Sequence, residues 1–180
     1  MLARLSAFWA RLERLVAAGL AAAVTLLILL NVVTRAFDAS LFWVDEAAIY
    51  AMIWMTFLAA SAAVQRRESV AVTLIPDVFD PRGQRWFVVL VDIVIFAFGL
   101  LMLWAVWRWF DPAGLLAAGG DILAFQGATF NFVYSEPTMT LGTAKAPIWS
   151  IVAIFACGVT LHGVANLSAS LLALRTPIPA

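Results

Sequence analysis

The chain has 180 residues, of which 64% are hydrophobic and 12% charged, whereas an average soluble domain has roughly 45–50% and about 25%. This composition excludes a disordered chain, a coiled coil and a collagen-like repeat, and it argues against any water-soluble fold. Eleven basic and eleven acidic residues cancel, so there is no net positive field to hold nucleic acid. One cysteine excludes an internal disulfide, and one histidine excludes a two-histidine metal or haem site.

Four long apolar runs organise the chain. The first is 15–34, and the second, 43–65, carries its acidic residues only at its start. The third, 86–107, contains Asp92 and no other formal charge, and the fourth, 146–174, contains none. A helix of about 20 apolar residues crosses the roughly 30 Å hydrocarbon core of a membrane. The sequence therefore predicts an all-α integral membrane protein, with four transmembrane helices in a single membrane domain, 1–180.

The residues before the first span place apolar side chains at helical spacing. Leu2, Leu5, Phe8, Trp9 and Leu12 alternate with arginines. Two interpretations are open: an interfacial amphipathic segment, or an extension of the first helix beyond the membrane.

A polar cluster flanks the connection between the first two spans. Asn31 and Arg35 are one helical turn apart, and Asp45 and Glu46 follow near the start of the second span. Carboxylates are favoured near a helix N-terminus, and antiparallel helices would bring Arg35 towards Asp45 or Glu46. We interpret the cluster as an ion pair at headgroup level that fixes two helices.

Two tryptophans and one arginine mark the second span. Trp43 precedes it at the depth that indole prefers, the membrane interface. Trp54 lies midway, where we expect it to pack against another helix and to need a partner for its N–H. Arg67 follows the span and opens a connection, 66–85, that contains prolines and a glycine and must therefore turn.

Asp92 lies about two turns inside the third span. We interpret it as a carboxylate near the interface that pairs with Arg85 or with a neighbouring helix, in preference to a proton or ion site, because the cost of a charge falls near the interface. The connection that follows, 108–145, exceeds the usual loop length, and long loops are often functional. Within it, 122–134 is compatible with a short hairpin or an interfacial helix.

The fourth span carries a stripe of small and polar residues every four positions: Gly158, His162, Asn166 and Ser170. Such a stripe on an apolar helix favours helix packing. A ligand role for His162 is disfavoured, because a metal or haem needs further ligands.

The basic residues predict the orientation. With four spans, eight fall on one side (Arg4, Arg11, Arg14, Arg66, Arg67, Arg82, Arg85 and Arg175) and three on the other (Arg35, Arg108 and Lys145). The positive-inside rule then places both termini and the loop 66–85 in the cytoplasm, and the loop 108–145 outside.

Several of these motifs together resemble a known family. Asn31-Val-Val-Thr-Arg35, Trp43-Val-Asp-Glu46, Trp54, Ala59-Ala60 and Arg67 are similar to the small membrane subunit, DctQ-like, of tripartite ATP-independent periplasmic (TRAP) transporters. The resemblance covers residues 15–110, and the layout of four spans extends it to the end of the chain.

The resemblance implies a division of labour. A large multi-span subunit is expected to carry the sodium and substrate sites, and a periplasmic binding protein to deliver an organic acid. This chain is then a scaffold in the bacterial inner membrane that catalyses no reaction and binds no cofactor. Its site residues are helix, subunit or lipid contacts: Asn31, Arg35, Trp43, Asp45, Glu46, Trp54, Arg67, Asp92, His162 and Asn166.

Three alternatives remain open at this level. A redox membrane anchor of a quinone-linked complex would have only an unusual His/Met option for its haem. A self-sufficient small exporter would depend on Asp92 as its intramembrane carboxylate. The third alternative is the small subunit of another tripartite carboxylate carrier.

Overall fold

The computed structural model describes residues 1–67 and 80–176, which form six helices and no strand. Four helices are long: α1 (Leu2–Ala36), α2 (Phe42–Arg66), α4 (Pro81–Phe110) and α7 (Ala146–Leu174). Each contains a stretch apolar and long enough to cross a membrane. The all-α fold is thus confirmed for the described chain, and each predicted span lies within one helix. Of the predicted loop 66–85, residues 68–79 lie outside the described residues.

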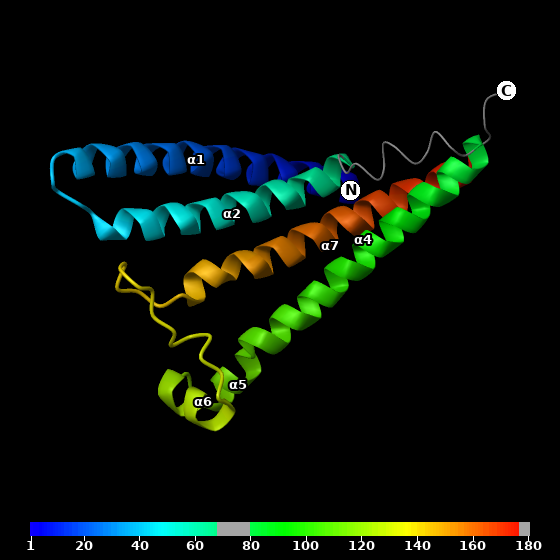
Figure 1. The fold of residues 1–180 in the computed structure, drawn as a ribbon. Coiled ribbons are helices and arrows are strands. Elements are labelled where there is room, and N and C mark those ends of the chain that lie inside the picture. The colour runs from blue at the N-terminus through cyan, green and yellow to red at the C-terminus, as the bar shows by residue number, and fades with distance from the viewer. Residues whose placement is uncertain (68–79, 177–180) are drawn as a thin grey trace.

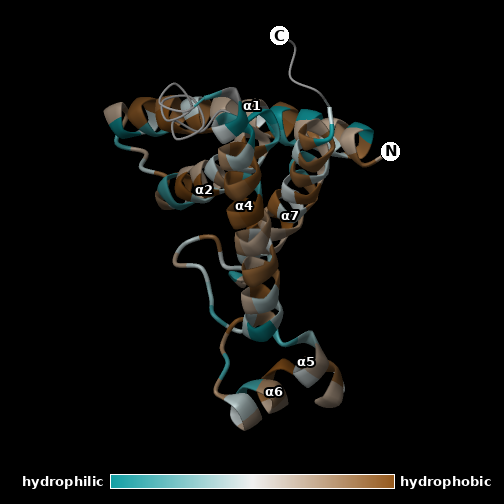
Figure 2. Ribbon diagram, turned by 90° about the vertical axis from the view of Figure 1, so that its right-hand side faces the viewer, coloured by the Kyte–Doolittle hydropathy of each residue, from teal (hydrophilic) through white to brown (hydrophobic). Residues whose placement is uncertain are grey.

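The long helices form two antiparallel hairpins. α1 packs against α2, α4 packs against α7, and α2 joins the hairpins by packing against α7 (Figure 1). The start of α1 and the end of α7 lie at one end of the bundle, which we call the terminal end. The connections 37–41 and 111–145 lie at the other, which we call the loop end (Figure 1). Hydrophobic residues dominate the middle of α4, and hydrophilic ones gather at its ends (Figure 2).

α1 begins far ahead of the first predicted span. Its helix is continuous from Leu2 to Ala36, 35 residues, which is about 50 Å at 1.5 Å per residue. The N-terminal segment is therefore a helical extension of the first span. Its location at a membrane interface stays a prediction.

Close backbone contact joins α4 to α7. A Cβ added to Gly99 would lie 3.0 Å from the Thr160 Cα, and one added to Gly163 would lie 3.0 Å from the Phe96 Cα. Because a Cβ at these distances would be tighter against the neighbouring backbone than most real Cβ contacts, the glycines let the two helices approach at this crossing.

Local capping explains where the helices begin and end. Asp80 caps α4 by accepting a hydrogen bond from the Gly83 N–H, and Pro81 follows at the first helical position, where proline costs no hydrogen bond. α2 and α4 both end at residues with left-handed backbone, Arg67 (φ 57°) and Asp111 (φ 39°).

The long connection 108–145 contains two short helices, α5 (Pro112–Ala117) and α6 (Ile122–Thr129). Of the two structures considered for 122–134, residues 122–129 adopt the helix, because Asp121 caps it by accepting from the N–H groups of Leu123 and Ala124. Phe125 on α6 is 1% exposed and meets Tyr134 edge to face. The connection thus has a small core of its own at the loop end.

Candidate functional site

The charged and polar side chains of the helices gather in three clusters, each of which joins separate elements. One lies at the terminal end around Arg67 and Asp92, one lies deeper around Glu13 and His162, and one lies at the loop end around Asp45 and Glu46. Together they contain eight of the ten candidate residues from the sequence, all except Trp43 and Trp54.

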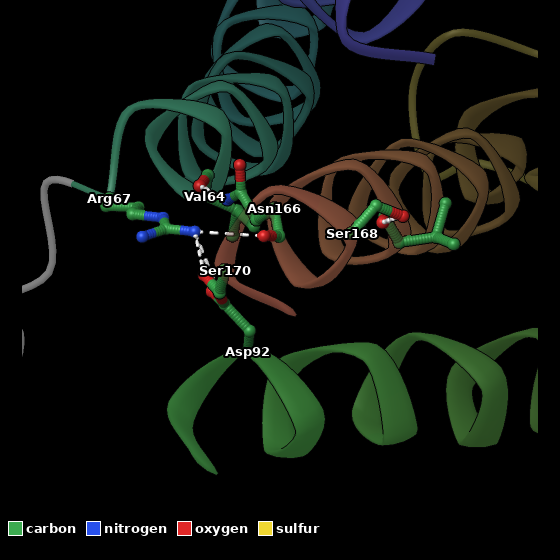
Figure 3. A network of polar contacts seen from close by, with 7 residues as sticks. Val64, Arg67, Asp92, Asn166, Ser168 and Ser170 are labelled. Carbon is green, nitrogen blue, oxygen red and sulfur yellow. Dashed lines mark hydrogen bonds and ion pairs between the residues drawn. The ribbon is translucent and has the colours of Figure 1, made fainter. Parts of the chain in front are cut away.

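At the terminal end, Arg67 ties α2 to both helices of the other hairpin (Figure 3). The Nη2 atom of Arg67 donates to Asp92 on α4 at 2.8 Å, to the Asn166 carbonyl at 3.0 Å and to the Ser170 hydroxyl at 2.6 Å. Ser170 also donates to Asp92, and the Asn166 amide donates to the Val64 carbonyl at 2.8 Å. We call this cluster the Arg67 network.

The Arg67 network settles the partner of Asp92. The Asp92 side chain is 2% exposed and pairs with Arg67 across the hairpins. Of the two partners expected from the sequence, the neighbouring helix is confirmed and Arg85 is wrong, because Arg85 instead donates to the carbonyls of Ala173 and Thr176 at the end of α7.

A second cluster, deeper in the bundle, joins α1 to α7. The Nε2 atom of His162 lies 3.0 Å from a carboxylate oxygen of Glu13, and its Nδ1 atom lies 2.8 Å from the Ser6 hydroxyl. His162 is 0% and Glu13 2% exposed. The predicted packing role of the stripe in α7 is confirmed here, since Gly158, His162, Asn166 and Ser170 all face other helices.

Sequence reasoning missed Glu13. It is the first acidic residue of the chain, and no role was predicted for it. A signal was available: Ser6, Ala10, Glu13 and Ala17 are the buried residues of α1 and recur at spacings of four and three, which place them on one helix face.

At the loop end, the first predicted pairing is resolved in favour of Asp45. Arg35 donates from Nη2 to Asp45 at 2.8 Å and from Nε to the Asn31 side-chain carbonyl at 3.0 Å. The Asn31 amide donates to the same carboxylate. The side chains of Arg35 and Asp45 are 60% and 51% exposed, so this pair lies on the surface.

Glu46 has a different role, which was not predicted: it holds the loop 139–141. Its carboxylate accepts hydrogen bonds from the backbone N–H groups of Met139 at 2.8 Å, Thr140 at 2.6 Å and Leu141 at 3.1 Å. The hydroxyls of Thr140 and Tyr50 donate to it as well, at 2.6 and 2.7 Å. We call this arrangement the Glu46 clasp.

The two tryptophans differ in environment. Trp54 donates from Nε1 to the Ile148 carbonyl on α7 at 2.8 Å, which confirms the expected partner for its N–H. Trp43 at the start of α2 is 42% exposed, and its contact with lipid or with another subunit stays a prediction.

The exposed pair of Arg35 and Asp45 allows a charge-swap prediction. Arg35→Glu places two carboxylates together and should lower the free energy of unfolding by about 1 kcal/mol, since exposed pairs are worth roughly 0–1 kcal/mol. Adding Asp45→Arg should restore most of this loss, whereas adding Glu46→Arg should restore none. Thermal unfolding in mild detergent measures all three, and equal rescue by both second changes would contradict the pairing.

The positions of the described side chains argue against a site in which they ligate a haem or a metal ion. Both ring nitrogens of His162 are engaged by Ser6 and Glu13, so this ring offers no free lone pair to a haem or metal. Within the described ranges, 1–67 and 80–176, no group of three His, Cys, Asp or Glu side chains is placed to hold a metal ion.

Comparison with known proteins gives one match. The family model described as "Tripartite ATP-independent periplasmic transporters, DctQ component" matches residues 24–173. A search of curated proteins gives no match. The matched residues include α2, α4 and all but the last residue of α7, and hence the Arg67 network and the Glu46 clasp.

Proposed function

Because this chain belongs to the DctQ family, the small membrane component of TRAP transporters, we propose that it is the scaffold subunit of a sodium-driven importer of an organic acid. In this proposal a large multi-span subunit binds sodium and substrate, and a periplasmic binding protein delivers the substrate. The family is a transporter component rather than an enzyme family, and we propose that the chain itself catalyses no reaction.

The pairing of buried charges between the two hairpins carries the proposal. Inside the helix bundle, the side chains of Glu13 and Asp92 meet His162 on α7 and Arg67 at the end of α2. Intramembrane charges that serve transport face a cavity or an ion path, whereas these are joined to fixed partners. Such pairs hold helices in place, which is the task of a scaffold.

The outer faces of the helices support contact with lipid and with a large subunit. Large apolar side chains on α1 and α4 are strongly exposed, among them Leu26 at 67%, Val32 at 62% and Leu101 at 58%. Exposed apolar surface of this extent on long helices is suited to hydrocarbon or to another membrane subunit.

The proposed orientation follows from the basic residues. Arg14, Arg67 and Arg85 lie towards the terminal end, which we propose faces the cytoplasm of a bacterial inner membrane. The Glu46 clasp and the connection 111–145 would then face the periplasm, where the binding protein acts.

Purification from native membranes in mild detergent tests the assembly. We expect a large multi-span subunit to accompany this chain through two chromatographic steps. Sodium-dependent uptake of a carboxylate in proteoliposomes should then require both chains and the binding protein. A monodisperse chain without a partner, or uptake undiminished when this chain is left out, would contradict the proposed function.

A further inference from the structure

Three buried polar atoms meet at one point beside Gly158 without a hydrogen-bond partner. They are the indole Nε1 of Trp9, the second carboxylate oxygen of Glu13 (Oε1) and the hydroxyl of Ser61. A Cβ added to Gly158 would lie 2.5 Å from Glu13 Oε1 and 3.2 Å from Trp9 Nε1, and it would also collide with Ser61 Oγ. Atoms from α1 and α2 therefore converge on one spot above the backbone of α7.

The chemistry of these atoms identifies what fits between them. The Trp9 N–H can only donate, the Glu13 carboxylate accepts, and the Ser61 hydroxyl can do either. A bound metal ion would require oxygen ligands and would face the positive end of the Trp9 N–H. A water molecule satisfies all three groups, because it accepts one hydrogen bond and donates others, and buried waters typically make about three.

We propose that Trp9, Glu13 and Ser61 bind one structural water molecule over Gly158. The water accepts from Trp9 Nε1, donates to Glu13 Oε1 and shares a hydrogen bond with Ser61. Burial of three unpaired polar groups would otherwise destabilise the fold. Gly158 leaves space for the water, since a Cβ at this position would lie against the same three atoms.

The water site extends the cluster around His162. The other carboxylate oxygen of Glu13 faces His162, which in turn bonds Ser6. With the water in place, a continuous hydrogen-bonded chain runs from Ser6 through His162 and Glu13 to Ser61. Because its members lie on α1, α7 and α2, the water becomes part of the contact between the two hairpins.

A double-mutant cycle tests the shared water. Trp9→Phe and Ser61→Ala each remove one group of the site, and each should shift the folding equilibrium about 5-fold or more towards the unfolded state. Trp9 and Ser61 do not hydrogen-bond each other but both lie beside Glu13 Oε1, so a shared water should couple their effects strongly. We expect the double variant to lose far less than the product of the two single effects, because either change already loses the water.

Matched controls separate the site from general packing. Ser168→Ala removes a hydroxyl that bonds only its own helix, at the Val164 carbonyl, and Trp104→Phe alters an indole that is 63% exposed. Both should leave the folding equilibrium nearly unchanged. Neutral or stabilising effects of Trp9→Phe and Ser61→Ala, or fully additive ones, would overturn the proposal.

Infrared spectroscopy of the full chain in hydrated lipid films detects the water directly. The wild-type spectrum should contain a sharp O–H stretching band that shifts in H₂¹⁸O, and Gly158→Ala should abolish it. If Gly158→Ala does not fold, the Ser61→Ala film is compared instead, with loss or displacement of the band expected. An unchanged band in both variants would overturn the assignment, and neither readout depends on transport.

Discussion

Replacing Arg67 by glutamine should lower the free energy of unfolding by about 3 kcal/mol, because it leaves the carboxylate of Asp92 buried without its cation. Asp92 is 2% exposed, and its remaining partner is the Ser170 hydroxyl. Glutamine can still donate a hydrogen bond, so the change isolates the loss of charge. Unfolding of the purified chain in mild detergent, followed by circular dichroism, measures the effect.

A second change distinguishes the loss of a charge partner from the loss of packing. Adding Asp92→Asn to Arg67→Gln removes the stranded charge and should recover most of the stability, since two neutral amides can pair. Arg85→Gln is the matched control: Arg85 bonds only exposed carbonyls at the end of α7, and a cation there is worth about 0.3–1 kcal/mol. No recovery in the double variant would show that Arg67 acts through its other contacts.

Replacing Glu46 by glutamine should release the loop 139–141. An ionised carboxylate accepts hydrogen bonds at roughly twice the strength of a neutral group, and the Glu46 clasp gathers donors from three consecutive backbone N–H groups. Hydrogen–deuterium exchange of these amides should accelerate by about tenfold or more, as the loss of charge-assisted bonds predicts. Exchange in α7 should not change.

The same loop provides the control. Glu136→Gln removes a carboxylate that pairs with Lys145 at 2.7 Å but does not contact the backbone of 139–141. We expect this variant to leave exchange at those amides unchanged. If the two variants accelerate exchange equally, the overall charge of the loop orders it, and the prediction that the Glu46 clasp holds 139–141 is contradicted.

The sequence predicted what depends on local pattern. Apolar runs of spanning length located α1, α2, α4 and α7, and the spacing of four in Gly158, His162, Asn166 and Ser170 identified the packed face of α7. The need of the Trp54 N–H for a partner was likewise correct, because a buried donor is rarely left unpaired.

Pairings between distant segments were harder to predict. Asp92 pairs with Arg67 and not with Arg85, because helix packing decides which side chains meet. Glu46 accepts hydrogen bonds from the backbone of 139–141, because the loop folds back onto the start of α2. Nearly every residue has a backbone N–H, so the sequence does not indicate which backbone donors Glu46 would meet. Glu13 did have a signal in the sequence, because it shares a face of α1 with the small residues Ser6, Ala10 and Ala17.

The division into two hairpins has a consequence for biogenesis. Polar contacts that cross between the hairpins include Glu13 with His162, and Arg67 with Asp92, so the first hairpin is made before the residues that pair with Glu13 and Arg67. A charge at the centre of an inserting helix costs about 2.5–3.5 kcal/mol, and the cost is smaller near the interface. Docking of the second hairpin supplies both partners in one step, so we expect the two hairpins to associate cooperatively. A chain whose hairpins have not docked therefore keeps these ionisable groups without their partners from the other hairpin.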